Sequence, residues 1–185
     1  MQDIIRQTVE VLRRGGTILY PTDTIWGVGC DARNAAAVEK LYAIKERDHN
    51  KSMLVLIPDN QEASGLPEAP DNRPTTYILP HERWQALLGE GIAQNLPAAD
   101  GSLGVRVPRH VFCQEVMRLL GAPLVSTSAN LSGQSSPQSY GEIEEELKRR
   151  VDYCVPPLPE FLSGETTGSR IVKVAADGTE TVIRP

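Results

Sequence analysis

The sequence predicts a three-layer α/β fold around a mixed β-sheet, because segments with helical spacing of apolar residues alternate with short apolar runs typical of buried strands. The chain closes with two predicted strands, 170–175 and 181–184, joined at the turn Asp177-Gly178. Such a hairpin is antiparallel, whereas strands separated by a helix are usually parallel. The sheet should therefore contain both directions. A length of 185 residues without internal repeats indicates a single domain over residues 1–185.

The first half of the chain supplies two helices and two strands. In order, the predicted elements are a helix up to the glycine pair 15–16, a strand over 17–20, a helix from 34 to about 45, a strand over 52–57 and a loop over 58–74. Helical spacing of Ile5, Val9 and Leu12 marks the first helix. Asn34 is a suitable N-cap for the second.

The second half continues the alternation. In order, it contains a strand over 75–79, a short helix around 84–88, a strand over 103–107, a helix around 112–120, a strand over 122–130, a helix over 142–150, an extended segment over 151–155 and the final hairpin. Pro108 closes the strand before it because proline has no N–H to donate. Phe112, Val116 and Leu120 share one face of the helix that follows.

The composition is that of an ordinary globular protein and argues against several classes of function. A net charge of −5 disfavours a general nucleic-acid coat protein, which needs clustered Lys and Arg. The N-terminal segment has scattered charges and no continuous apolar run, so neither a signal peptide nor a membrane span is predicted. The three cysteines are unclustered and are expected to be reduced thiols. We therefore expect a cytoplasmic protein with no metal site.

Small polar residues follow two of the predicted strands. Pro21 ends the first of them, and Thr22, Asp23 and Thr24 come directly after it. The later strand runs into Ser126-Thr127-Ser128-Ala129-Asn130. Ligands of open α/β sheets gather beyond strand ends, so both clusters are candidate binding segments. Each also has a purely structural interpretation, as a helix cap or a Ser/Asn turn.

Two cations lie near the predicted end of the second helix. Lys45 and Arg47 could complement the helix dipole in solvent, or they could neutralise phosphate oxygens. The histidines offer no comparable site. His49, His81 and His110 all have polar neighbours in the sequence and are predicted to be surface residues.

Four blocks together resemble one known family. They are YPTDTIWGVGCDA at 20–32, Lys-x-Arg at 45 and 47, GVRVP at 104–108 and STSANLSG at 126–133. In this order they resemble the YrdC-like threonylcarbamoyl-AMP synthase family, and the similarity spans nearly the whole chain. The chain resembles a divergent, single-domain, YciO-like branch of this family. The resemblance implies a twisted mixed sheet flanked by helices around a large central cavity.

The resemblance also implies a reaction. Family members join L-threonine, bicarbonate and ATP into threonylcarbamoyl-adenylate and release pyrophosphate, and partner proteins then transfer the threonylcarbamoyl group to an adenosine of tRNA. Mg²⁺ would arrive with the triphosphate, since the sequence offers no protein cage for it. Catalysis of this kind depends on positioning and electrostatics. That explains why the sequence contains no Ser/His/Asp or Cys/His constellation.

Residue by residue, the resemblance implies two groups of contacts. Lys45 and Arg47 would be catalytic, and the nucleotide would be bound by Lys45, Arg47, Ser128, Asn130, Ser169 and Arg184. Threonine would be bound by Thr22, Thr76 and Arg106. Thr24 is a further candidate donor to threonine, and Trp26 or Tyr20 could supply an apolar wall.

The chain departs from the family pattern at several positions. Asp48 stands where proline usually follows Lys-x-Arg, and Leu56 replaces a histidine in the next strand. The 58–74 segment is short, and Gly168-Ser169-Arg170 stands where Pro-Ser-Thr is expected. Amino-acid specificity and turnover are therefore the properties to test.

Two other hypotheses remain open from the sequence. One is a non-catalytic module of the same fold that binds tRNA or double-stranded RNA through the cationic concavity, which would give strongly salt-dependent binding. The other is an enzyme of this fold acting on a different carbamoylated or adenylated small molecule.

Overall fold

The computed structural model describes residues 1–50, 52–59, 61–69, 71–161 and 167–185. Its strands are β1 (Ile18–Tyr20), β2 (Gly27–Gly29), β3 (Leu54–Leu56), β4 (Thr75–Leu79), β5 (Leu103–Arg106), β6 (Leu124–Ser128), β7 (Tyr153–Cys154), β8 (Arg170–Val174) and β9 (Glu180–Arg184). Within the described ranges they form one nine-stranded sheet in the order β7-β1-β2-β6-β3-β5-β4-β8-β9.

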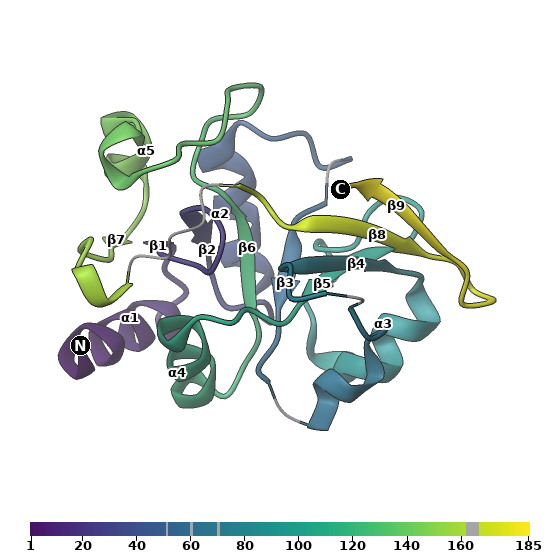
Figure 1. Cartoon of the computed structure of the whole chain (residues 1–185). Coiled ribbons are helices and arrows are strands. Elements are labelled where there is room, and N and C mark those ends of the chain that lie inside the picture. Colours follow the sequence, from purple (N-terminus) through teal and green to yellow (C-terminus); the bar gives the residue numbers. More distant parts are fainter. Residues whose placement is uncertain (51, 60, 70, 162–166) are drawn as a thin grey trace.

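The sheet is mixed, as the sequence predicts. β1 and β7, β3 and β5, and β4 and β8 are parallel pairs. The other neighbours are antiparallel, including the hairpin of β8 and β9. Gly178 turns that hairpin with a φ of 90°, a conformation that glycine adopts without strain. Figure 1 shows this hairpin, in yellow, at the opposite end of the molecule from α1.

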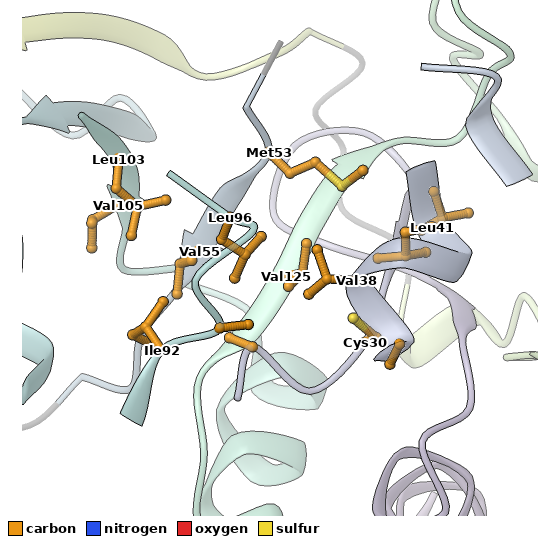
Figure 2. Packing of buried hydrophobic residues seen from close by; sticks show 14 of the residues in the cluster. Cys30, Val38, Leu41, Met53, Val55, Ile92, Leu96, Leu103, Val105 and Val125 are labelled. Atoms are coloured by element: carbon orange, nitrogen blue, oxygen red, sulfur yellow. The ribbon is translucent and has the colours of Figure 1, made fainter. Parts of the chain in front are cut away.

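Helices cover both faces of the sheet. They are α1 (Gln2–Arg13), α2 (Ala35–Lys45), α3 (His81–Leu88), α4 (Val111–Leu120) and α5 (Glu145–Arg150). α2 and α3 pack on one face, where Val55, Val105 and Val125 are fully buried (Figure 2). α1 and α4 lie side by side on the other face (Figure 1). The predicted arrangement of helices flanking a mixed sheet is confirmed.

The second face is only partly covered by helices. Ile18, Tyr20, Leu56 and Leu124 lie under α1 and α4 in a second core cluster. Successive side chains of a strand point to opposite faces, so the residues that flank Val105 and Val125 point away from the first core. Those flanking residues include Arg106 and Ser126. Their side chains lie on the part of the second face that α1 and α4 leave uncovered, among other polar groups.

The structure departs from the sequence predictions at β2, at the start of α5 and at His110, among other places. Gly27 and Gly29 belong to β2, a strand that is absent from the predicted elements. The helix predicted over 142–150 begins only at Glu145, after a 3₁₀ turn at Tyr140–Glu142. His110 is 9% exposed, and its Nε2 lies 2.9 Å from the carbonyl of Phe161. The prediction of a surface histidine is wrong there because α4 begins directly after His110 and draws it into the second core.

β2 can pair so closely only because Gly29 has no side chain. A Cβ at this position would lie 2.0 Å from the carbonyl oxygen of Val125 and 2.9 Å from Cε1 of Tyr20. We expect Gly29→Ala to lower the free energy of unfolding by about 3 kcal/mol, measured by urea denaturation, because the backbone must move apart. Gly91→Ala is the matched control, since its Cβ would meet nothing closer than Arg33 at 3.9 Å. Equal stability of the two variants would contradict this account.

Candidate functional site

A cavity of about 330 Å³ opens on the partly covered face of the sheet. It brings together side chains that are far apart in the sequence. The predicted site residues that line it are Thr22, Arg47, Thr76, Arg106, Ser128, Ser169 and Arg184. Lys45 and Asn130 do not line it, although each lies two residues from a lining residue in the chain, Arg47 and Ser128 respectively.

The segment after Pro21 is folded by its own hydroxyl groups. Thr22 Oγ1 accepts from the Thr24 N–H at 3.1 Å and donates to the Ile25 carbonyl at 2.8 Å. The two threonine hydroxyl oxygens are 3.0 Å apart. Because the Thr22 hydroxyl already donates its single proton to the Ile25 carbonyl, the Thr24 hydroxyl is the donor in its hydrogen bond with Thr22. The crowding of small polar residues after β1 therefore builds a tight turn whose hydroxyl groups face the cavity.

Arg106 links this turn to β5. Its Nη1 lies 3.2 Å from Asp23 Oδ1 and donates to Thr24 Oγ1 at 3.1 Å. The side chains of Arg106 and Asp23 are only 3% and 8% exposed. Asp23 Oδ2 also accepts from the Arg109 N–H at 3.0 Å. The Arg106 Nε–H is buried and has no hydrogen-bond partner among the described residues, although Arg106 itself lines the cavity.

The two cations at the end of α2 point in different directions. The Lys45 ammonium donates to the carbonyls of Ser128 and Asn130, and Lys45 is 1% exposed. Arg47 lines the cavity and donates from Nη2 to the Ser52 carbonyl at 2.9 Å. Lys45 therefore connects the cationic segment, residues 45–47, directly to the hydroxyl-rich segment, residues 126–130.

Burial changes the pKa of both cations. It lowers the pKa of Lys45 to about 8, and the nearby charge of Arg47 adds to the effect. Burial also lowers the pKa of Arg47. Of the two, Arg47 brings partly desolvated positive charge to the cavity wall.

The lowered pKa of Lys45 gives a pH dependence with a definite sign. In the unfolded chain lysine titrates near 10.4, so between pH 8 and about 10.4 the unfolded state binds more protons than the folded state. The stability of the wild type relative to Lys45→Met should therefore rise by about 1 to 2 kcal/mol between a pH of about 7 and a pH of about 9.5. Urea denaturation at the two pH values measures it. Burial raises the pKa values of Cys30 and Cys113. Their titration affects both proteins equally, so its contribution to the free energy of unfolding cancels in this comparison. A difference in the free energy of unfolding between wild type and Lys45→Met that does not change with pH would contradict the lowered pKa of Lys45.

Asn130 organises the hydroxyl-rich segment from outside the cavity. Its Nδ2 donates to the carbonyls of Leu131, at 2.9 Å, and Gln134, at 3.0 Å. Together with the Lys45 ammonium, these bonds fix the chain beyond β6 and present Ser128 to the cavity.

The C-terminal strands close the opposite wall. The hydroxyl groups of Thr76 and Ser169 are 2.7 Å apart, and both residues are buried. Arg184 Nε donates to the Ser169 carbonyl at 2.9 Å. Burial lowers the pKa of Arg184, and the charge of Arg106 contributes. Residues from four distant parts of the chain thus meet around one space.

Comparison with known proteins shows which family the chain belongs to. The family model for Sua5, YciO and YrdC proteins, described as telomere recombination, matches residues 10–185. The chain belongs to this family.

Individual relatives agree with the family assignment. A threonylcarbamoyl-AMP synthase of Stenotrophomonas maltophilia is 32% identical over 166 residues, which cover 86% of each chain. The crystal structure of E. coli YciO superposes with a TM-score of 0.74 at 26% identity and covers 100% of this chain and 89% of its own. P. abyssi Sua5 complexed with L-threonine shares the fold, with a TM-score of 0.77 at 21% identity over 98% of this chain. The present chain spans only 53% of that Sua5 chain.

In this Sua5/YciO/YrdC family member the cavity also has an apolar strip that the sequence analysis missed. It consists of Leu54, Ile78 and Ile171. Gly104 lies between Leu54 and Ile78 in the pairing of β3, β5 and β4. Strand parity could have found part of this strip, because Ile78 lies two residues from Thr76 and so shares its face. Leu56, in contrast, is buried in the second core and does not line the cavity.

The described part of this family member lacks a protein metal cage and a membrane-spanning helix. No group of three or more His, Cys, Asp or Glu residues there could hold a metal ion. None of the helices described has the length and apolar character needed to span a membrane. Cys30, Cys113 and Cys154 are free thiols.

Proposed function

We propose that the protein synthesises L-threonylcarbamoyladenylate from L-threonine, bicarbonate and ATP. The observation that carries the proposal is the convergence of Arg47, Arg106 and Arg184 with hydroxyl groups around one cavity of about 330 Å³. Relatives that are 32% to 35% identical over most of their length carry the name threonylcarbamoyl-AMP synthase.

The residue types suit the chemistry of this nucleotidyl transfer. The threonine amine condenses with bicarbonate to a carbamate, with loss of water. A carbamate oxygen then attacks the α-phosphorus of ATP, the bond from that phosphorus to the β-phosphate bridging oxygen breaks, and pyrophosphate leaves with the electron pair. Two anions must approach each other, so fixed positive charge lowers the barrier. Mg²⁺ bound to ATP would neutralise part of the phosphate charge.

The proposed roles follow from position in the cavity. Arg47 and Arg184 bind the phosphates, with Ser128 and Ser169 as hydroxyl donors. Lys45 and Asn130 act on the nucleotide through the segment that they hold. This differs from the direct contact that the sequence resemblance implies for them.

The threonine end of the cavity is assigned to the turn after β1. Arg106 binds the threonine carboxylate, because its guanidinium is already oriented by Asp23. Thr76 binds remaining polar groups of threonine, whereas Thr22, whose hydroxyl is fully used within the turn, shapes this end of the cavity. The aliphatic strip of Leu54, Ile78 and Ile171 would cover apolar parts of the ligands.

The product would serve tRNA modification. We propose that partner proteins of the tRNA-modification system receive the adenylate and transfer its threonylcarbamoyl group to a tRNA adenosine. The free thiols suit work in the reducing cytoplasm. A non-catalytic RNA-binding module is less well supported, since the arginines line a cavity too small for a duplex and the net charge is −5.

Omitting substrates one at a time tests the proposal. The protein is incubated with ATP, Mg²⁺, bicarbonate and threonine, pyrophosphate is measured, and the adenylate is identified by mass. We expect pyrophosphate release only when threonine and bicarbonate are both present. ATP turnover that ignores threonine, or an adenylate formed with another amino acid instead, would overturn it.

A further inference from the structure

The residue between Lys45 and Arg47 has an unusual backbone conformation. Glu46 has φ 50° and ψ 42°, and it is the only non-glycine residue with a positive φ among the residues described. The Glu46 N–H donates to Ala43 at 3.2 Å and the Arg47 N–H donates to Tyr42 at 3.1 Å. Glycine normally occupies the left-handed position of such a helix end. A glutamate there is strained and needs support.

Support comes from a distant helix. Arg150, the last residue of α5, donates from Nη1 to the Ile44 carbonyl at 3.1 Å and to Glu46 Oε1 at 2.8 Å. Its Nη2 pairs with Glu146 on the same helix. One guanidinium thus binds both the last turn of α2 and the side chain of the left-handed residue.

This turn decides where Arg47 points. On one side of Glu46 the Lys45 ammonium is bound to the 128–130 segment, so that end cannot rotate freely. On the other side Arg47 reaches the cavity. If Glu46 relaxed to a negative φ, the chain would leave α2 in a different direction and would carry the Arg47 side chain with it.

We propose that Arg150 is a positioning residue that holds Glu46 in its left-handed conformation and so directs Arg47 into the cavity. Exposed ion pairs contribute little to stability by themselves, and the Glu46 side chain is 61% exposed. The contribution of Arg150 is therefore geometric. The expected effect on ATP rests on the proposed function, whereas the effect on the turn does not.

Amide hydrogen exchange tests the turn without any assay of activity. In Arg150→Ala we expect the Arg47 amide to exchange about tenfold faster, because its bond to Tyr42 is no longer held in place. Arg149→Ala is the matched control, since among the described residues Arg149 hydrogen-bonds to the Glu145 carbonyl of its own helix and not to α2. Adding Glu46→Gly to Arg150→Ala should restore protection, because glycine adopts a positive φ freely. An Arg47 amide unaffected by Arg150→Ala would overturn the proposal.

Kinetics test the consequence for the ligand. We expect Arg150→Ala to raise the KM for ATP about fivefold and to leave the KM for threonine unchanged, with recovery in the double variant. Equal increases in both constants, or no recovery with Glu46→Gly, would indicate a general structural role and would overturn the proposal. If no variant and no wild type releases pyrophosphate while the exchange results hold, the proposed function fails and the positioning of Arg47 stands.

Discussion

Arg106→Met should produce a protein that is both less stable and inactive. The substitution leaves the Asp23 carboxylate buried without its charge partner, 3.2 Å away in the wild type. Removing one member of a buried ion pair costs about 3 to 5 kcal/mol, and we expect a loss of that size in urea denaturation. Pyrophosphate release should also disappear, because the proposed carboxylate-binding group is gone.

A second substitution separates the two effects. Asp23→Asn in the Arg106→Met background removes the unpaired charge, so most of the stability should return while activity stays absent. Arg109→Met is the matched control, because within the described part of the chain the Arg109 guanidinium hydrogen-bonds to Asn72 at the surface. An active double variant would show that Arg106 serves the fold and not the substrate.

Lys45→Met should reduce pyrophosphate release about 100-fold, because the segment that carries Ser128 loses its attachment to α2. The ammonium donates to the Ser128 and Asn130 carbonyls in a buried position. Methionine has similar length but no donor, so stability should also fall by about 1 to 3 kcal/mol. Steady-state kinetics with ATP and threonine varied separately measure the functional loss.

The control for this variant lies on the same helix. Lys40 donates to the Gly15 carbonyl at the surface, so Lys40→Met should keep nearly full activity. If Lys45→Met retains wild-type turnover, the contact between the cationic and hydroxyl-rich segments is not needed for the reaction.

Much of the site could be predicted from the sequence because its residues sit at strand ends. Thr22 follows β1 and Ser128 ends β6, and polar residues there point beyond the sheet toward ligands. Arg106 also follows from local pattern, since it is a lone charge in an apolar strand. The mixed sheet follows from the alternation of helices and strands and from the final hairpin.

Other features depend on contacts between distant segments and left no local signal. The inward direction of Lys45 depends on carbonyls more than eighty residues away. The conformation of Glu46 depends on Arg150, on another helix. β2 was missed because Gly27 and Gly29 are poor strand formers, and only close pairing with β6 makes glycine necessary there.

A crystal structure with a non-hydrolysable ATP analogue and threonine tests the central claim most directly. We expect the phosphates within hydrogen-bonding distance of Arg47 and Arg184, with the 126–128 segment on the same side and the threonine carboxylate on Arg106. Phosphates bound instead in the separate hollow beside Arg73 and Arg170, with no ligand between Arg47 and Ser128, would contradict it.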